Sequence, residues 1–174
     1  MVLDRAYEPL RLSGSPAMSE ESLSQYWQLW TPNKALGLTG VRAAYAIAPL
    51  GAHGAAAQLE ALAPSWPIGA HGVAMLRAWC QPAVHEWLSQ SRHTLREWKR
   101  RQLALCESLG WECLASEANF FAARIPHPRL LEQLREREIK LRDCTSFGLP
   151  GHVRLSVQPP AAQDALRQAW ENLI

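Results

Sequence analysis

The stretch TPNKALGLTGVR, residues 31–42, decides the fold and the chemistry expected of this chain. Lys34 lies among glycines and other small residues, and Arg42 follows eight positions later. A lysine amine can bond covalently to an aldehyde carbon, and a guanidinium can hold a phosphate with two parallel hydrogen bonds. This pattern favours a site for a phosphorylated aldehyde. An ordinary surface loop is the alternative that the stretch by itself leaves open.

The same stretch resembles the lysine segment of the aspartate aminotransferase superfamily, the class I/II pyridoxal-phosphate (PLP) enzymes of fold type I. That segment has Ser or Thr three residues before the lysine, then Gly-Leu-x-Gly-x-Arg and a Gly-Tyr pair. The matching residues are Thr31, Lys34, Gly37, Leu38, Gly40 and Arg42, with Ala44-Tyr45 at the place of the Gly-Tyr pair.

Three more segments resemble the family, and all four occur in the family's order across nearly the whole chain. Residues 2–7 (VLDRAY) are similar to a strand that ends in Asp-Glu-Ala-Tyr, with Arg5 at the place of the Glu. Residues 141–143 (LRD) and 153–157 (VRLSV) are similar to two late strands that carry arginines. The resemblance implies an α/β fold. Part of the PLP-binding large domain, a mixed and mostly parallel sheet with helices, would span 1–82. A small α+β C-terminal domain, entered by a long helix, would span 83–174.

The resemblance covers only the later half of such an enzyme. The family's earlier half supplies a Gly-rich turn for the phosphate, an aromatic ring that stacks on the pyridine, and an asparagine. We therefore expect a C-terminal half, from a truncated reading frame or a separate fragment, with little activity of its own. The full-length family implies a homodimer, and a complementing N-terminal half is a possible partner.

The resemblance also assigns roles to individual residues. Asp4 would face the pyridine nitrogen, and Tyr7 would bond to the phenolic oxygen of the cofactor. Lys34 would be the covalent partner of PLP and later carry a proton. The phosphate contacts would come from Thr31, Asn33 and Arg42. The ordinary alternatives are a turn-forming Asp4 and a packing Tyr7.

Substrate contacts are implied at three positions in the second half of the chain. Arg154 resembles the arginine that binds the substrate's α-carboxylate, whereas a single arginine on a strand is more often solvated. Arg142 could bind a distal phosphate of the substrate. Asn119 resembles a residue that lies near the cofactor in the branch that uses phosphorylated substrates. The expected substrate is therefore a small phosphorylated amino acid.

Residues 142–151 look most like the threonine-phosphate decarboxylase type of the cobalamin-biosynthesis members, which are relatives of histidinol-phosphate aminotransferases. Loss of CO2 and amino transfer differ in which bond to Cα lies perpendicular to the cofactor ring. The sequence does not contain that angle. A histidinol-phosphate-type aminotransferase, a non-catalytic remnant and a half-enzyme that needs a second chain all remain open.

Composition excludes several other classes of protein. The 174 residues are 48% hydrophobic, and the formal net charge of +2 is too small to indicate nucleic-acid binding. The one basic run, residues 99–101, is expected to be a solvated helix face. Four cysteines without C-x-x-C spacing and six scattered histidines predict no metal site and reduced thiols. No apolar run reaches the roughly 18 residues that span a membrane, so a cytoplasmic protein is expected.

Hydrophobic spacing and turn residues predict the order of the elements. A helix of residues 83–109, ended by Gly110, is the clearest, and its tryptophans are expected to anchor the core. Before this helix, the expected elements are a strand ending at Asp4, a helix over 19–30 that runs into a strand at 27–31, a strand over 41–48, and helices over 55–62 and 70–80. After it, they are a strand pair within 111–125, a helix over 128–136, strands over 139–143 and 152–157, and a helix over 161–173.

Overall fold

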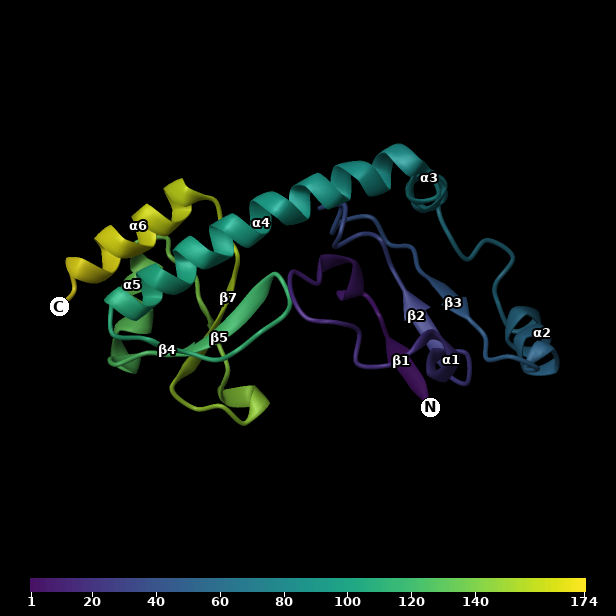
Figure 1. Ribbon diagram of the computed structural model, residues 1–174, viewed down its shortest axis with the longest axis horizontal. Coiled ribbons are helices and arrows are strands. Elements are labelled where there is room, and N and C mark those ends of the chain that lie inside the picture. The colour runs from purple at the N-terminus through teal and green to yellow at the C-terminus, as the bar shows by residue number, and fades with distance from the viewer. The chain divides into compact units, whose positions relative to one another are not determined.

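The computed structural model describes all of residues 1–174 and divides into two compact units, Met1–Gln90 and Ser91–Ile174 (Figure 1). The division falls within the long helix α4, Pro82–Ser108. The domain ranges expected from the sequence, 1–82 and 83–174, stay predictions.

Unit 1 contains a mixed three-stranded sheet in the order β1-β2-β3. Strand β1 (Val2–Asp4) is parallel to β2 (Trp27–Trp30), and β2 is antiparallel to β3 (Tyr45–Ile47). Asp4, the last residue of β1, is the register partner of Leu29, which in turn pairs with Ala46. The sheet therefore presents the Asp4 carboxylate at the end of a strand, where α/β folds place ligand-binding groups.

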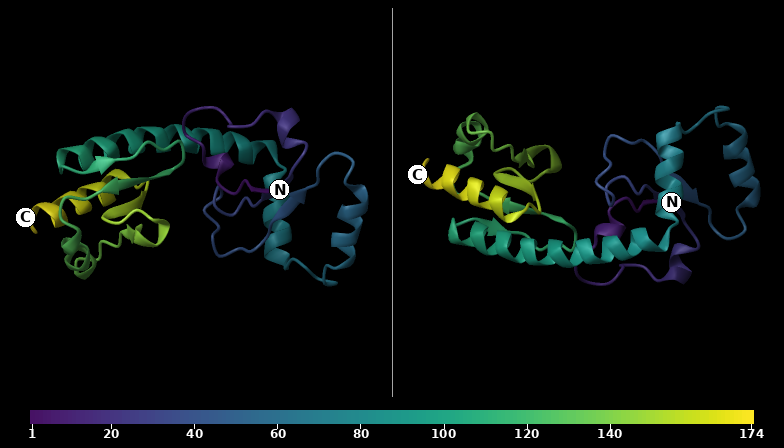
Figure 2. Two further views of the ribbon diagram at one scale, coloured as in Figure 1. Left: turned by 90° about the horizontal axis from the view of Figure 1, so that it is seen from below. Right: turned by 90° about the horizontal axis from the view of Figure 1, so that it is seen from above.

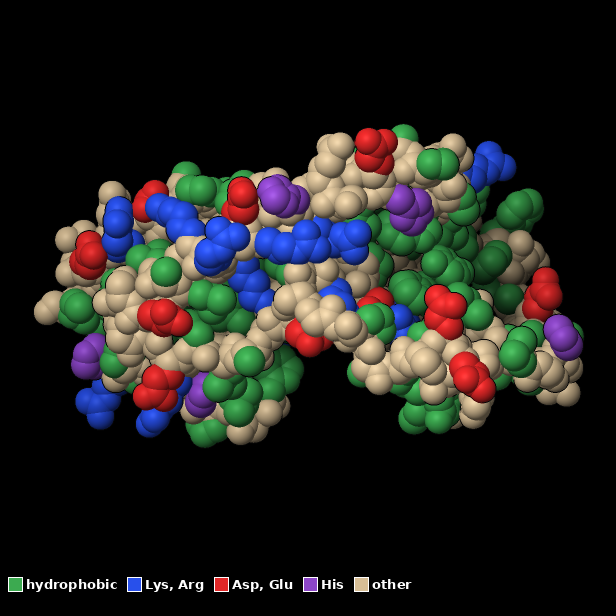
Figure 3. Space-filling model, in the orientation of Figure 1, with side chains coloured by type: hydrophobic (Ala, Val, Ile, Leu, Met, Phe, Trp, Pro, Cys, Tyr) green, Lys and Arg blue, Asp and Glu red, His purple; other side chains and the backbone are tan.

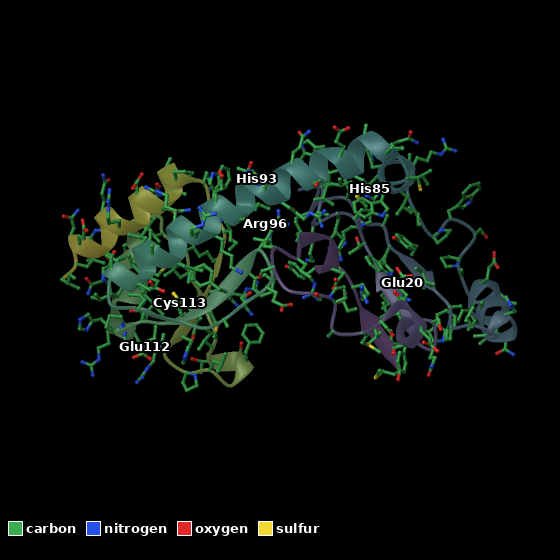
Figure 4. The ribbon with its side chains drawn as sticks, viewed as in Figure 1. Glu20, His85, His93, Arg96, Glu112 and Cys113 are labelled. Carbon is green, nitrogen blue, oxygen red and sulfur yellow. The ribbon has the colours of Figure 1, made fainter.

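The helices of unit 1 are short. The 3-10 helix η1 spans Glu8–Leu10, α1 spans Glu20–Leu23, α2 spans His53–Ala61 and α3 spans Ala70–Trp79. The prediction of a helix through residue 30 is wrong beyond α1, because a tight turn in which the Tyr26 N–H donates to the Leu23 carbonyl leads directly into β2. Where α4 follows α3, the His85 Nε2 donates to the Trp79 carbonyl at 2.7 Å, which ties the two helices together (Figure 4).

Unit 2 contains an antiparallel four-stranded sheet in the order β4-β5-β7-β6. Its strands are β4 (Glu112–Cys113), β5 (Phe120–Arg124), β6 (Arg142–Asp143) and β7 (His152–Ser156). Its helices are the 3-10 helices η2 (Pro128–Leu130) and η3 (Thr145–Phe147), with α5 (Leu131–Glu136) and α6 (Pro160–Glu171). Within this unit, α6 runs alongside the C-terminal part of α4 (Figure 2).

Buried glutamines join α6, α4 and the end of β7. Gln163 donates to the Trp98 carbonyl at 3.0 Å and to the Gln158 carbonyl at 2.7 Å. Gln102 donates to the Ser156 carbonyl at 3.1 Å and accepts from the Gln158 N–H at 2.9 Å. These bonds satisfy amides that would be costly to bury unpaired. The surrounding core consists of Cys106, Trp111, Phe121, Ala123, Ile125, Leu134, Val153, Leu155, Leu166, Ala169 and Trp170.

Helix α4 departs from two expectations about its side chains. Trp87 was expected to anchor the core, but its side chain is 48% exposed. Lys99 was expected on a solvated basic face, but it is only 8% exposed, because its ammonium group bonds to the carbonyls of Ser116 and Ala118. Other Lys and Arg side chains do gather along α4 on the face drawn in Figure 3. Helical periodicity alone does not show whether a basic residue lies on a solvated helix face or is buried by tertiary contacts.

The ends of α4 and α5 share one backbone motif with different residues. Gly110 (φ 76°) follows α4, and the Trp111 N–H donates to the Cys106 carbonyl at 2.9 Å. Glu138 (φ 64°) follows α5, and the Ile139 N–H donates to the Leu134 carbonyl at 2.9 Å. Glycine adopts this left-handed conformation without strain, whereas a residue with a Cβ does not. Glu138 is the only non-glycine residue of the chain with a positive φ.

Glu138→Gly is therefore expected to raise the free energy of unfolding of unit 2 by about 0.5 to 1 kcal/mol. The strain relieved at the left-handed position is larger than the extra chain entropy of an unfolded glycine. Urea unfolding followed by circular dichroism measures the change. Gly110→Ala is the matched control, because its added Cβ meets nothing within 4 Å. It is expected to lower stability by about 1 kcal/mol through the backbone alone. A destabilised Glu138→Gly variant would contradict this account.

Candidate active site

The residues predicted to hold the cofactor lie around one pocket of unit 1. This pocket, which we call the lysine pocket, has a volume of about 1050 Å³. Five of the six predicted cofactor residues line it: Asp4, Thr31, Asn33, Lys34 and Arg42. The sixth, Tyr7, is not part of the lining, but the Lys34 Nζ lies 4.9 Å from the centroid of its ring. The amine and the guanidinium, eight residues apart in sequence, thus open into the same cavity.

The conformation of the 31–42 loop explains why these two groups converge. The Leu38 N–H donates to the Asn33 carbonyl at 2.8 Å, and Gly37 takes a left-handed conformation with φ 67°. The returning chain then lies beside the start of the loop. There the Thr31 hydroxyl donates to the Ala43 carbonyl at 2.7 Å. The small residues of the motif allow this compact turn, and the turn brings the two charged side chains to one cavity.

Thr31 and Asn33 each donate one side-chain hydrogen bond within the loop. The single hydroxyl proton of Thr31 is directed at the Ala43 carbonyl, and the Asn33 Nδ2 donates to the Val41 carbonyl at 3.5 Å. The Asn33 Oδ1 is buried without a hydrogen-bond partner. The Thr31 hydroxyl could donate to a phosphate in the lysine pocket only if it turned away from the Ala43 carbonyl, whereas Asn33 Nδ2 has a second N–H beyond the one directed at Val41. Arg42, in contrast, is exposed on the lining and presents a complete guanidinium fork.

Asp4 is oriented by its own backbone. The Ala6 N–H donates to the Asp4 Oδ1 at 2.9 Å, which holds the carboxylate at the end of β1. Ala6 also lines the pocket and is nearly buried. Ala6 belongs to the VLDRAY segment, but no role was predicted for it. Its small side chain leaves space where a larger one would fill the cavity.

Other lining residues were not predicted to take part in the site, although Tyr45 belongs to the motif. Trp30 and Tyr45 line the pocket and stack with ring centroids 6.5 Å apart, and the Trp79 Nε1 donates to the Tyr45 hydroxyl at 3.3 Å. Glu60 adds a second carboxylate to the lining from the alanine-rich helix α2. Trp30 comes directly before the 31–42 motif, and this position was the feature of the sequence that could have indicated its place in the lining. Nothing in the sequence pointed to Glu60.

Arg5, at the family's Glu position, belongs to a neighbouring ion cluster and not to the pocket lining. The guanidinium carbon of Arg5 lies 5.0 Å from the centroid of the Trp30 ring, and its Nη2 lies 3.8 Å from the Glu8 Oε2. Arg11 donates to both oxygens of Glu8, at 2.9 and 3.0 Å. Those hydrogen bonds lower the pKa of Glu8 below its ordinary value.

The arginines predicted to bind substrate lie together in unit 2. Arg142 and Arg154 are register partners on β6 and β7, and both line a cavity of about 310 Å³. Each guanidinium lies over an aromatic ring, with Arg154 5.3 Å from the centroid of Phe120 and Arg142 5.4 Å from that of Phe147. Two like charges directly opposite each other are unfavourable unless an anion lies between them. This arrangement is compatible with an anionic ligand.

Asn119 is not part of the lining of that cavity. Its carbonyl accepts from the Val157 N–H at 2.9 Å, and its side-chain Oδ1 is buried without a partner. The preceding turn is held by Lys99, whose Nζ donates to the carbonyls of Ser116 and Ala118 at 2.5 and 2.8 Å. Burial lowers the pKa of Lys99, and the charge of Glu117 partly opposes this shift. Lys99 was missed because its burial depends on tertiary contacts.

The four cysteines are free thiols. Burial raises the pKa of Cys106 far above its ordinary value, and the hydrogen-bonded thiol of Cys113 on β4 (Figure 4) contributes to the shift. No group of three or more His, Cys, Asp and Glu side chains is placed to hold a metal ion. None of the helices combines the length and the apolar character needed to span a membrane.

The chemistry of the lysine pocket fits PLP. The cofactor needs an amine for its aldehyde, a cation for its phosphate and a carboxylate for its pyridine nitrogen. Lys34, Arg42 and Asp4 supply these three groups around one cavity. Lys34 is also the only lysine that lines the pocket.

Comparison with known proteins shows the family. Residues 2–173 match the family described as aminotransferase class I and II. A histidinol-phosphate aminotransferase from Halorubrum lacusprofundi is 32% identical over 157 residues, which are 90% of this chain and 41% of that protein. The enzyme of the same name from Symbiobacterium thermophilum is 31% identical over 75% of this chain and 35% of its own length. The chain therefore belongs to the class I and II aminotransferases, a family of PLP-dependent enzymes.

Solved structures show the same fold. The histidinol-phosphate aminotransferase of Clostridium acetobutylicum matches 99% of this chain with a TM-score of 0.82 at 18% identity. A decarboxylase from Sulfurospirillum multivorans matches 99% with a TM-score of 0.79, also at 18% identity. These matches confirm the predicted α/β fold of PLP-dependent aminotransferases. The chain spans about half the length of these two structures, 53% and 52%, and less than half of the two relatives above.

Proposed function

We propose that this chain carries the covalent lysine and the phosphate-binding arginine of a PLP-dependent enzyme that acts on a phosphorylated amino substrate. The convergence of Lys34, Arg42 and Asp4 on the lysine pocket is the observation that carries the proposal. When bound, PLP withdraws electrons from the substrate carbon next to the nitrogen, which weakens the bonds at that carbon.

Each residue of the chain has a separate task in this proposal. Lys34 holds the cofactor through its amine and afterwards moves a proton at the substrate carbon. Arg42 binds the phosphate, assisted by the second amide N–H of Asn33 and by Thr31 once its hydroxyl turns toward the phosphate. Asp4 stabilises the positive charge on the pyridine nitrogen. Tyr7, whose ring lies beneath the Lys34 ammonium, bonds to the phenolic oxygen of the cofactor.

The substrate is bound by unit 2 in this proposal. Arg154 takes the carboxylate of an amino-acid or oxo-acid substrate, and Arg142, opposite it in the sheet, takes the phosphate of a phosphorylated substrate. Asn119 stays a further candidate whose side-chain oxygen has no partner within the chain. The names of the relatives favour amino transfer of the histidinol-phosphate type. Decarboxylation of threonine phosphate, with a role in cobalamin biosynthesis, is the second candidate and rests on the resemblance of residues 142–151.

Covalent trapping tests the proposal within the natural chain. The sequence contains three lysines, Lys34, Lys99 and Lys140, of which Lys99 is buried and Lys140 is exposed. After incubation with PLP, reduction with borohydride and proteolysis, mass spectrometry is expected to find the cofactor mainly on Lys34. Lys140, which lines the cavity of Arg142 and Arg154, reports the labelling of an exposed amine outside the lysine pocket. Equal labelling of Lys34 and Lys140 would refute a cofactor site in the lysine pocket.

Catalytic turnover is proposed to need a part of the family's polypeptide beyond the site residues named above. The relatives are about twice as long or longer. The resemblance implies that the ring-stacking aromatic residue belongs to the family's earlier half. A complementing chain or a homodimer of a longer protein would supply it. Mixing this chain with the N-terminal half of a relative and assaying CO2 release against amino transfer would distinguish the two candidate reactions.

A further inference from the structure

Gly72 in α3 occupies a position that excludes any side chain. It is buried in the helix, where a glycine costs about 1 kcal/mol relative to alanine. A Cβ at this position would lie 2.5 Å from the Ile68 Cγ2, 2.9 Å from the Ala43 Cβ and 3.1 Å from the Arg42 carbonyl oxygen. The glycine thus allows α3 to approach the backbone of residues 42–43 more closely than any other residue would.

The segment that α3 approaches carries the phosphate-binding arginine. Arg42 and Ala43 both line the lysine pocket. The Ala43 carbonyl accepts the hydroxyl proton of Thr31 at 2.7 Å. The backbone that bears Arg42 is therefore in contact with both Thr31 and α3. A displacement on the α3 side would move the origin of the Arg42 side chain relative to Lys34.

We propose that Gly72 is a positioning residue for Arg42, and that the contact of α3 with residues 42–43 sets the affinity of the lysine pocket for a phosphate group. This inference rests on the proposed function. The guanidinium fork holds phosphate only when its two hydrogen bonds are aligned, so a small shift of its backbone weakens both. Misplacement by about 1 Å can cost on the order of 100-fold in sites of this kind.

The test compares PLP with pyridoxal, which has the same aldehyde but no phosphate. Both are titrated into wild-type chain and the Gly72→Ala variant, and the absorbance of bound cofactor is followed. The variant is expected to bind PLP about tenfold more weakly, which corresponds to roughly one charge-assisted hydrogen bond. Its affinity for pyridoxal is expected to stay within about twofold, because Lys34 is unaffected.

Gly54→Ala is the matched control. Gly54 also lies in a helix, α2, but a Cβ there meets nothing within 4 Å. It is expected to bind both ligands as the wild type does. The double variant Ala43→Gly/Gly72→Ala removes the Cβ that the new methyl group would meet at 2.9 Å. It is expected to recover part of the lost preference for PLP.

Four results would overturn the inference. If the Gly72→Ala variant preferred PLP to pyridoxal as strongly as the wild type does, Gly72 would have no positioning role, and the proposed function would be unaffected. Equal losses for PLP and pyridoxal, or loss of the folded circular-dichroism signal, would make Gly72 a residue of general packing only. A wild-type chain that does not prefer PLP to pyridoxal would overturn the phosphate role of Arg42 together with this inference.

Discussion

Replacing Lys34 with alanine is expected to abolish borohydride-trapped PLP in unit 1. No other lysine lines the pocket, so no amine there can replace the one removed. Labelling should fall to the level of the exposed Lys140, while Arg42 and Asp4 still offer non-covalent contacts. Peptide mapping by mass spectrometry after reduction measures the covalent part, and equilibrium dialysis before reduction measures the remaining binding.

Lys34→Arg separates the covalent role from the charge. The Lys34 ammonium lies 4.9 Å from the centroid of the Tyr7 ring, and an arginine would keep a cation there. A guanidinium does not lose its proton at ordinary pH and cannot bond to the aldehyde, so trapping should be lost as in the alanine variant. Lys140→Ala should leave trapping at Lys34 unchanged. If PLP were still trapped within unit 1 of the Lys34→Ala variant, another nucleophile would hold the cofactor.

Trp170→Ala is expected to lower the free energy of unfolding of unit 2 by about 3 to 5 kcal/mol. Trp170 on α6 is 0% exposed, and its ring meets that of Trp111 at 4.9 Å between centroids and 74° between planes. Truncation would leave a large cavity beside α4 and the sheet. Amide hydrogen exchange of the β5 and β7 N–H groups reports on this unit alone, which matters because two units need not unfold together.

The Trp170 Nε1 provides the control for this prediction. This N–H is buried without a hydrogen-bond partner, which costs free energy in the folded state. Trp170→Phe keeps an aromatic ring and removes the unpaired donor, so its loss of stability should be much smaller than that of the alanine variant. A phenylalanine variant as unstable as the alanine variant would contradict a loss of stability that scales with the volume of the cavity.

Local sequence patterns predicted most elements of both units. Strand β1 ends at Asp4 as expected, and Gly110 follows the long helix α4. The strand expected over 41–48 is shorter, because only Tyr45–Ile47 pairs with β2 while residues 41–43 bond to the 31–33 segment. Hydrophobicity is the same for a paired strand and an extended loop, so the pattern could not separate them.

Four segments in the family's order, residues 2–7, 31–42, 141–143 and 153–157, predicted the family and the fold. Within residues 31–42, the spacing of Lys34 and Arg42 along a tight loop limits where their side chains can lie, and both line the lysine pocket. The close approach of α3 at Gly72, the burial of Lys99 and the pairing of Arg142 with Arg154 depended on contacts between distant segments. Those contacts are set by packing and register across many residues. A local pattern contains no record of which distant backbone a side chain will meet.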